Sequence, residues 1–318
     1  MNKGIIIALI VAASLILVGG ILFAAAVLLN GAGLGNAELK TNTHNVSESV
    51  QSILLDTDTA NVSILPALDG EVRVVCVEED RAKHAVDVEN GVLSIRVQNE
   101  KQWYDYIGFH FASPSVTVYL PSGEYGALTA KVSTGKVQIA KAFTFARMDL
   151  TASTGDVTVE ASCKEDLNVK LSTGAVLLRN VSAERISLKA STGNMTLEGV
   201  RCAKAIDTEV STGKTRMSDV RCESLTSRGS TGDVELQDVI VQTELFVKRS
   251  TGDIRFEACD TDRVELHTTT GDIEGTFLSP KSFRAHSDTG RVDVPNGMDG
   301  SKGAVDTDTG RIRIEILS

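Results

Sequence analysis

Ser230-Thr231-Gly232-Asp233-Val234 is one copy of a short phrase that recurs along most of this chain. Ten copies or near variants follow one another at intervals of 19 or 20 residues, and their glycines are Gly135, Gly155, Gly174, Gly193, Gly213, Gly232, Gly252, Gly271, Gly290 and Gly310. A fixed period of this length is typical of a protein built from stacked repeats. The period is too short for helix-containing repeats and for β-propeller blades.

Within one repeat the apolar residues alternate as they do in half-buried strands. Alternation runs over residues 176–178 and again over 186–190, on either side of a bend at Asn180-Val181-Ser182. This pattern predicts two short strands and two turns per repeat. Glycine suits a sharp corner because it accepts positive φ without steric cost. The sequence therefore predicts an all-β fold, a parallel β-solenoid or β-helix of about ten rungs of 19–20 residues over residues 126–318.

The N-terminal segment from Gly4 to Leu29 contains no charged residue. At ~1.5 Å per helical residue it exceeds the ~30 Å hydrocarbon core of a bilayer. It predicts one transmembrane helix at residues 4–29, an uncleaved signal anchor that contacts the lipid bilayer. A cleaved signal peptide and a buried core helix are the alternatives. Lys3 precedes the segment and the next Lys or Arg is Lys40, so we expect residues 1–3 in the cytoplasm and the bulk of the chain outside the cell membrane.

Three further parts complete the predicted organisation. Residues 30–48 are polar and rich in Gly and Asn, which predicts a flexible juxtamembrane linker. Residues 49–125 show irregular β patterning and predict an N-terminal cap with the first rungs, in which Ala60 stands where a repeat glycine is expected. Residues 311–318 end in mid-strand, which predicts an open edge that permits end-to-end self-association.

Composition narrows the classes of function. The 318 residues carry a net charge of −10 and are 42% hydrophobic but only 4% aromatic. This acidic balance argues against nucleic-acid binding. The cysteines lack the paired spacing of a zinc site or a redox motif, and they are Cys76, Cys163, Cys202, Cys222 and Cys259. Cys202 and Cys222 take similar places in adjacent repeats, as buried small side chains or as a disulfide. We expect no cofactor.

Two surfaces are candidates for partner contact. An aromatic segment within 102–111 predicts either a contact patch for a protein, glycan or membrane surface or packing over the first rung, and it contains Trp103, Tyr104, Tyr106, Phe109 and Phe111. The residue four before the repeat glycine forms a mostly basic outward column, which we call the basic stripe and define by Lys170, Lys189, Arg228 and Lys248. This stripe predicts contact with an anionic wall polymer or lipid headgroup, or a solvated ladder. His267 and His286 follow in the same column.

Catalytic interpretations are weak. Two Asp-Thr-Gly motifs, at 288–290 and 308–310, resemble an aspartic-protease dyad, but they lie 20 residues apart within successive repeats. Asp233, Asp253 and Asp272 follow three repeat glycines and are interpreted as solvated turn carboxylates or as ligands of a cation. The repeats vary by one residue in length, so no inserted loop walls a cleft of the kind that carbohydrate-cleaving β-helices use. The chain is therefore predicted not to be an enzyme.

Residues 50 to 318 resemble a bacterial adhesin-like family of unknown function with an N-terminal anchor. The resemblance is carried by Val118-Tyr119-Leu120-Pro121, Ser153-Thr154-Gly155-Asp156-Val157, Ser230-Thr231-Gly232-Asp233-Val234 and Ser250-Thr251-Gly252-Asp253-Ile254. It implies a β-solenoid at the cell envelope. The leading hypothesis is a non-enzymatic, membrane-anchored, extracytoplasmic adhesin-like binding or scaffold protein that contacts an envelope protein or polysaccharide. The alternatives are an accessory regulator of an envelope-stress response, acting through a protein partner, and a carbohydrate-active enzyme.

Overall fold

The computed structural model describes residues 4, 11–21, 25, 39–99, 113–295 and 301–317. Residues 11–21 are helical, and from residue 39 onward the described chain consists of strands and turns. Half of the segment 4–29 falls outside the described residues. Within the described part, no helix is both long enough and apolar enough to cross a membrane. The anchor and the cytoplasmic location of residues 1–3 stay predictions.

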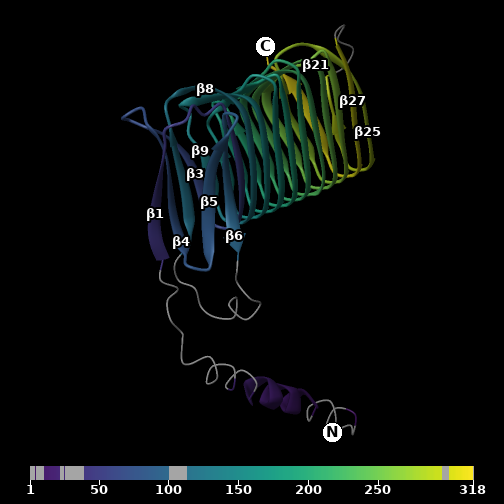
Figure 1. Cartoon of the computed structure of the whole chain (residues 1–318). Coiled ribbons are helices and arrows are strands. Elements are labelled where there is room, and N and C mark those ends of the chain that lie inside the picture. The colour runs from purple at the N-terminus through teal and green to yellow at the C-terminus, as the bar shows by residue number, and fades with distance from the viewer. Residues whose placement is uncertain are drawn as a thin grey trace.

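The described residues form one continuous sheet of 28 strands that is wound into a solenoid (Figure 1). The strands of the N-terminal end are β1 (Leu39–Val46), β2 (Ser52–Thr59), β3 (Asn61–Pro66), β4 (Val72–Glu79), β5 (Ala82–Glu89), β6 (Val92–Asn99) and β7 (Ser115–Leu120). The strands of the body are β8 (Gly123–Thr134), β9 (Val137–Ile139), β10 (Phe143–Thr154), β11 (Val157–Val159), β12 (Ser162–Cys163), β13 (Asp166–Thr173), β14 (Val176–Arg179), β15 (Ser182–Ala183), β16 (Arg185–Thr192), β17 (Met195–Glu198), β18 (Arg201–Cys202), β19 (Ala205–Thr212), β20 (Thr215–Thr231), β21 (Val234–Thr251), β22 (Ile254–Cys259), β23 (Arg263–Thr270) and β24 (Ile273–Phe277). The strands of the far end are β25 (Lys281–Thr289), β26 (Val292–Asp293), β27 (Ser301–Thr309) and β28 (Ile312–Ile316).

The body confirms the predicted parallel β-solenoid. One rung consists of β13, β14 and β15, and each of these strands pairs in parallel with its counterpart in the next rung. Leu167 thus lies beside Ile186, and both belong to the single aliphatic core. The prediction of two strands per repeat was wrong for these rungs, which contain a third strand of two residues. Such a strand, Ser182–Ala183 for example, is too short to produce a visible alternation.

The ten repeat glycines stack in one column at a corner of the rungs. All of them have positive φ, between +126° and +158°. A Cβ added to Gly155 would lie 2.6 Å from the carbonyl carbon of Gly135, and one on Gly193 would lie equally close to that of Gly174. The corner therefore requires glycine for its backbone conformation and also for the close approach of the next rung. Gly135 makes the same approach to Ala60, so the stack continues toward the N-terminus.

The residue that follows the glycine links neighbouring rungs. The backbone N–H of Asp253 donates to Oδ1 of Asp233 at 3.0 Å, and that of Asp272 donates to Oδ1 of Asp253 at 2.8 Å. The N–H of Arg311 donates in turn to Oδ1 of Asp272 at 2.7 Å. Asn194 accepts from the next rung in the same way. These side chains thus hold the corner together, which explains Asp or Asn at this place without a bound cation.

The last two rungs are interleaved at the far end of the stack (Figure 1). Strand β27 pairs with β23 on one side and with β25 on the other. Strand β28 lies likewise between β24 and β26. Gly310 therefore stacks on Gly271, and Gly290 stacks on Gly310. The chain leaves one place in the stack open, forms the end rung, and then returns to fill that place.

Charge alternation fits the interleaved order. Arg313 lies between Glu274 and Asp293, each of which is its register partner. Asp306 lies in the same way between His267 and His286. Stacking in chain order would instead bring Glu274 and Asp293 together. Opposite charges on neighbouring strands contribute roughly 0.2–1 kcal/mol, and like charges are destabilising.

This arrangement corrects the predicted open edge at two of the residues 311–318. Residues 312 and 313 of β28 are covered on both sides, whereas residues 314–316 pair only with β24 among the described residues. The end rung is instead made by β25 and β26. Phe283 in β25 packs over Gly303, where a Cβ would lie 2.5 Å from Cδ1 of the ring. Because Gly303 has no side chain, the ring of Phe283 has room to lie over it and cover the end of the core.

The N-terminal end is interleaved in the same manner. Strand β2 lies between β6 and β8, and β3 lies between β7 and β9. Antiparallel strands then continue the sheet, because β5 pairs with β6 and β4 pairs with β7. Strand β1 pairs with β4 along its whole length. Leu39–Val46 was therefore wrongly assigned to the flexible linker 30–48. Its polar sequence suits an edge strand that is partly exposed.

Candidate functional site

The basic stripe lies on the outer face of the long strands. Lys170 is the register partner of Lys189, and Arg228 is that of Lys248. All four of its side chains are exposed. Glu209 belongs to the same column by its place in the repeat, and the structure confirms that it lies between Lys189 and Arg228. Lys189 Nζ lies 3.0 Å from Glu209 Oε2, so the stripe is two pairs of cations separated by one carboxylate.

A small groove crosses the stripe at this carboxylate. Its volume is about 230 Å³, and it is lined by Ser187, Leu188, Lys189, Asp207, Thr208, Glu209, Thr226 and Arg228. The guanidinium of Arg228 lies over the ring of Phe246, 4.8 Å from its centroid. This contact holds the Arg228 charge in place. Lys170 and Lys248 form no ion pair among the described residues, so their charges remain available to an anionic ligand.

The two histidines of this column are not neighbours, contrary to their order in the sequence. Asp306 lies between them, and its Oδ2 is 3.1 Å from Nδ1 of His267. His286 instead contacts Asp288, whose Oδ1 is 2.9 Å from Nε2. Asp288, which belongs to one of the two Asp-Thr-Gly motifs, is 66% exposed on the outer surface. Neither histidine is positioned to share a metal ion with the other.

The neighbouring face carries a ladder of alternating charge. The register runs from Arg216 through Glu235 and Arg255 to Glu274. A hollow of about 320 Å³ lies among these side chains. Hydrogen bonds from Lys214, and then from Arg216, hold the pKa of Glu235 below its usual range. Each charge on this face already has an opposite partner, so the face offers little to a charged ligand.

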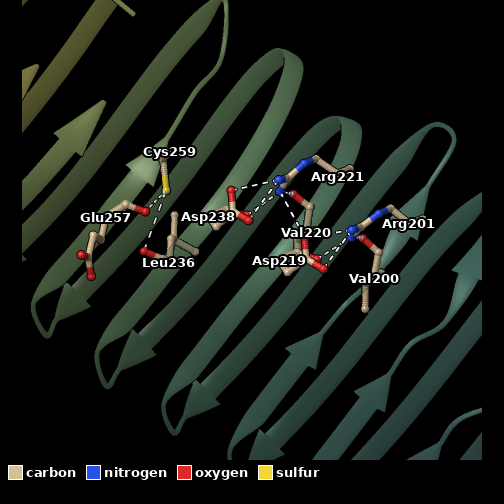
Figure 2. A network of polar contacts seen from close by, with 9 residues as sticks. All are labelled: Val200, Arg201, Asp219, Val220, Arg221, Leu236, Asp238, Glu257 and Cys259. Carbon is tan, nitrogen blue, oxygen red and sulfur yellow. Dashed lines mark hydrogen bonds and ion pairs between the residues drawn. The ribbon is translucent and has the colours of Figure 1, made fainter. Parts of the chain in front are cut away.

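Two arginines clamp the second corner of the rungs (Figure 2). Arg201 Nη2 donates to both carboxylate oxygens of Asp219 at 2.8 Å, and its Nη1 donates to the Asp219 carbonyl at 2.6 Å. Arg221 repeats this contact with Asp238 one rung further along. Asp219 and Asp238 both have φ of +51°. The bidentate pairs therefore stabilise a corner with left-handed backbone conformation. These arginines and aspartates have a structural role.

The five cysteines are free thiols and all are buried. Cys202 and Cys222 occupy adjacent rungs without a bond between them. Burial raises the pKa of Cys222 to about 12 and that of Cys202 to about 11. These thiols are consequently protonated and shielded at neutral pH. The aromatic segment Trp103, Tyr104, Tyr106, Phe109 and Phe111 lies outside the described residues, so its contact patch stays a prediction.

Sequence reasoning did not identify Arg249 as a buried charge. Arg249 occupies a core position and is fully buried. Its Nη2 donates to Oγ1 of Thr215 and to Oγ of Ser227, both at 3.0 Å, whereas its Nε has no hydrogen-bond partner in the described structure. Gly229 leaves the room for this side chain, since a Cβ there would lie 3.1 Å from the Arg249 guanidinium. A glycine beside an arginine, in a column that is aliphatic in the preceding rungs, was the available signal.

Several solved structures resemble the chain at low sequence identity. No curated protein matches the sequence. Solved structures that resemble the chain include a candidate adhesin from Bacteroides fragilis, 14% identical, which covers 87% of this chain and 97% of its own with a TM-score of 0.37. A candidate lipid-binding protein from Parabacteroides distasonis is 14% identical and covers 88% of this chain and 98% of its own, with a TM-score of 0.43. A candidate adhesin from the same organism is 13% identical and covers 89% and 98%, with a TM-score of 0.41.

The sequence profile of one family matches almost all of the described solenoid. The family is described as Toastrack DUF4097, and the match extends over residues 50–315. It covers more than half of the chain and agrees with the resemblance seen in the repeated Ser-Thr-Gly-Asp phrases. The chain belongs to the Toastrack DUF4097 family.

Proposed function

We propose that the chain is a non-enzymatic, membrane-anchored binding or scaffold solenoid of the bacterial cell envelope. Residues 4–29 form its single membrane anchor, residues 1–3 lie in the cytoplasm, and the solenoid lies outside the cell. Its ligand is an anionic polymer of the envelope. The observation that carries the proposal is the basic stripe, two pairs of exposed cations in one column on the face of an acidic protein.

The spacing of the stripe suits a long, repetitive ligand. Successive strands lie ~4.8 Å apart, so cations in neighbouring rungs can meet successive charges of an extended polyanion. An exposed ion pair contributes only about 0.2–1 kcal/mol, but several pairs act together when the scaffold is rigid. Because the backbone is already ordered, little conformational entropy is lost on binding. The surrounding negative charge confines a polyanion to the stripe.

The surface relief also favours binding over catalysis. The two hollows described above are small and partly open to solvent, with volumes of about 230 and 320 Å³. The nearly constant length of the repeats supplies no loops that would enclose a substrate and exclude water, as catalysis on a polymer requires. A polymer lying along such a face is held but is not distorted.

Binding is tested with the full-length chain and isolated cell-wall sacculi, with and without their phosphate-containing polymers. The variant K170E/K189E/R228E/K248E is compared with K141E/K164E/K204E/K302E, which changes the net charge equally at exposed lysines outside the stripe. We expect the stripe variant to lose sacculus binding by tenfold or more, since about 1.4 kcal/mol corresponds to tenfold. The control variant should bind as the wild type does. Equal loss in both variants would contradict the proposal.

Topology needs a separate measurement. Protease added to intact cells should degrade the solenoid. The repeats would be protected only if the folded protein resists the protease or if the solenoid lies inside the cell. Lysed cells provide the control for intrinsic protease resistance. Full protection in intact cells together with degradation after lysis would place the solenoid inside the cell and refute the proposed location.

A further inference from the structure

A buried group of metal-binding side chains lies at the N-terminal end of the solenoid, away from the basic stripe. Cys76 and Glu78 are two residues apart on the inward side of β4, and His84 lies on β5 after the turn of the hairpin. Cys76 is fully buried, and the side chains of Glu78 and His84 are each 2% exposed. A thiol sulfur, a carboxylate oxygen and an imidazole nitrogen all lie within 4.8 Å of one another.

Neighbouring side chains hold two of these groups in position. Glu78 Oε2 accepts the backbone N–H of His84 at 2.7 Å and lies 2.8 Å from His84 Nδ1. The other carboxylate oxygen, Oε1, accepts from Asn42 Nδ2 at 2.6 Å. Thr57 Oγ1 lies 2.8 Å from Nε2 of His84. Metal ligands are typically oriented by such outer partners, here supplied by β1 and β2.

We propose that Cys76, Glu78 and His84 bind a divalent transition-metal ion of the zinc class through Sγ, Oε2 and Nδ1. A thiolate and an imidazole favour zinc over calcium or magnesium, which prefer oxygen ligands. One thiolate and one carboxylate neutralise a divalent cation, so the occupied site carries no net charge. This neutrality suits a site that is closed to solvent. Three protein ligands leave the fourth tetrahedral position to water.

Proton movements balance as follows. Cys76 loses its thiol proton to solvent when the sulfur–metal bond forms. His84 binds the ion through an Nδ1 without a proton, and its Nε2–H then donates a hydrogen bond to Thr57 Oγ1. One proton is therefore released per ion at neutral pH, and metal affinity rises with pH.

A second histidine lies beside the group. His44 pairs with Val74, the inward residue next to Cys76 on β4, and it is the inward neighbour of Asn42 on β1. Its Nε2 is buried and has no hydrogen-bond partner among the described residues. A water molecule on the metal is a suitable partner for this nitrogen. An occupied site would fasten β1, β2 and the β4–β5 hairpin together, which closes the N-terminal end of the solenoid.

The test uses the untagged full-length chain in detergent, treated with a chelator and then titrated with zinc. We expect about one zinc ion per chain, one proton released per ion in weak buffer, and a higher unfolding temperature. Cys76→Ser and His84→Gln should lose this binding. Cys222→Ser, which changes another buried cysteine in the body of the solenoid, should keep it.

Cobalt supplies a readout that does not depend on a variant folding. Wild-type protein loaded with cobalt should show a near-ultraviolet thiolate-to-metal charge-transfer band, and circular dichroism should show that Cys222→Ser and Cys76→Ser remain folded. Absence of that band in the wild type would overturn the proposal, whatever the variants do. Zinc binding by a folded Cys76→Ser that equals the wild type would also overturn it.

Discussion

Engineered cysteines can test the interleaved end of the solenoid. In the structure His267 is the register partner of Asp306, whereas His286 lies one rung further away. The double variant H267C/D306C should therefore form a disulfide under mild oxidation. The matched variant H267C/H286C should not form one. These two results would be exchanged if the repeats stacked in the order of the chain.

The separations decide which pair can react. Adjacent strands are ~4.8 Å apart, so Cα atoms two rungs apart are separated by about 9.6 Å. A disulfide requires a Cα separation of about 4.4–6.8 Å, which only the first pair satisfies. The closed loop spans 39 residues, for which the chain-entropy relation gives about 4 kcal/mol of stabilisation. Loss of the half-exposed contact between His267 and Asp306 removes at most about 1 kcal/mol, so a net gain of about 3 kcal/mol is expected.

The assay compares oxidised and reduced protein. Peptide mapping identifies the bonded residues, and denaturant titration of each form measures the gain in stability. The native thiols should not compete, because all five are buried. If H267C/H286C crosslinks in high yield and H267C/D306C does not, the interleaved order is wrong and β28 forms the end of the stack.

Three further changes test the packing. Gly193→Ala should destabilise the solenoid by about 3 kcal/mol or more in denaturant titration, because φ is +140° and the added Cβ would meet the backbone of the neighbouring rung. The control is Gly123→Ala, where an added Cβ meets nothing within 4 Å, and it should change stability by less than about 0.5 kcal/mol. Arg249→Met should stabilise the protein by about 1–3 kcal/mol, because burial lowers the pKa of Arg249 to about 10 and its contacts do not offset its desolvation; a destabilised variant would show that these contacts do offset it. Burial raises the pKa of Asp260, but the fully buried Lys281 together with hydrogen bonds from Ser279 and the Thr261 backbone outweighs this and leaves the pKa below its usual range. That contribution to stability is present above the unfolded value of about 3.9 and is lost as pH falls through the lowered pKa, so acid denaturation curves of Asp260→Asn should lack it, and this variant should cost about 3–5 kcal/mol at neutral pH.

The body of the fold was predictable because each rung leaves the same mark on the sequence. Glycine is needed at every first corner, for its positive φ and for the close approach of the next rung, so the period appears directly. Alternation of apolar residues then indicates the strands and shows which of their side chains face the core. Ala60 could be recognised as a degenerate corner by the same logic, and it lies beneath Gly135.

The order of the last rungs could not be read from the repeats alone. Each rung has the same spacing of glycine and apolar residues, so this spacing fits the chain-order stack and the interleaved stack equally well. The information lies between rungs, in pairs such as Glu274 with Arg313 and Phe283 with Gly303. Comparing charge alternation in both possible orders would have favoured the interleaved one. Strand β1 was missed because most of its residues are polar and its pairing with β4 leaves no mark in its own sequence.

The buried metal-binding group shows a similar limit. Alternation places Cys76 and Glu78 on one side of a strand, and this was visible in the sequence. Adding His84 requires the register of the β4–β5 hairpin, and the outer partners come from two other strands. The absence of paired cysteines argued against a zinc site made of cysteines. It did not address a site with one cysteine and two ligands of other types.

The columns of the solenoid also indicate where binding is to be sought. The corner glycines, the aspartates that follow them and the arginines at the second corner all have contacts within or between rungs that account for their identity. The neighbouring face alternates in charge from rung to rung, as expected of a ladder selected for stability. The basic stripe does not, because Lys170 stacks on Lys189 and Arg228 on Lys248. Two cations ~4.8 Å apart repel by about 0.9 kcal/mol even at the dielectric constant of water. Packing gives no compensation at Lys170 and Lys248, and an anionic ligand would remove the repulsion, so this is the column in which folding alone leaves the sequence unexplained.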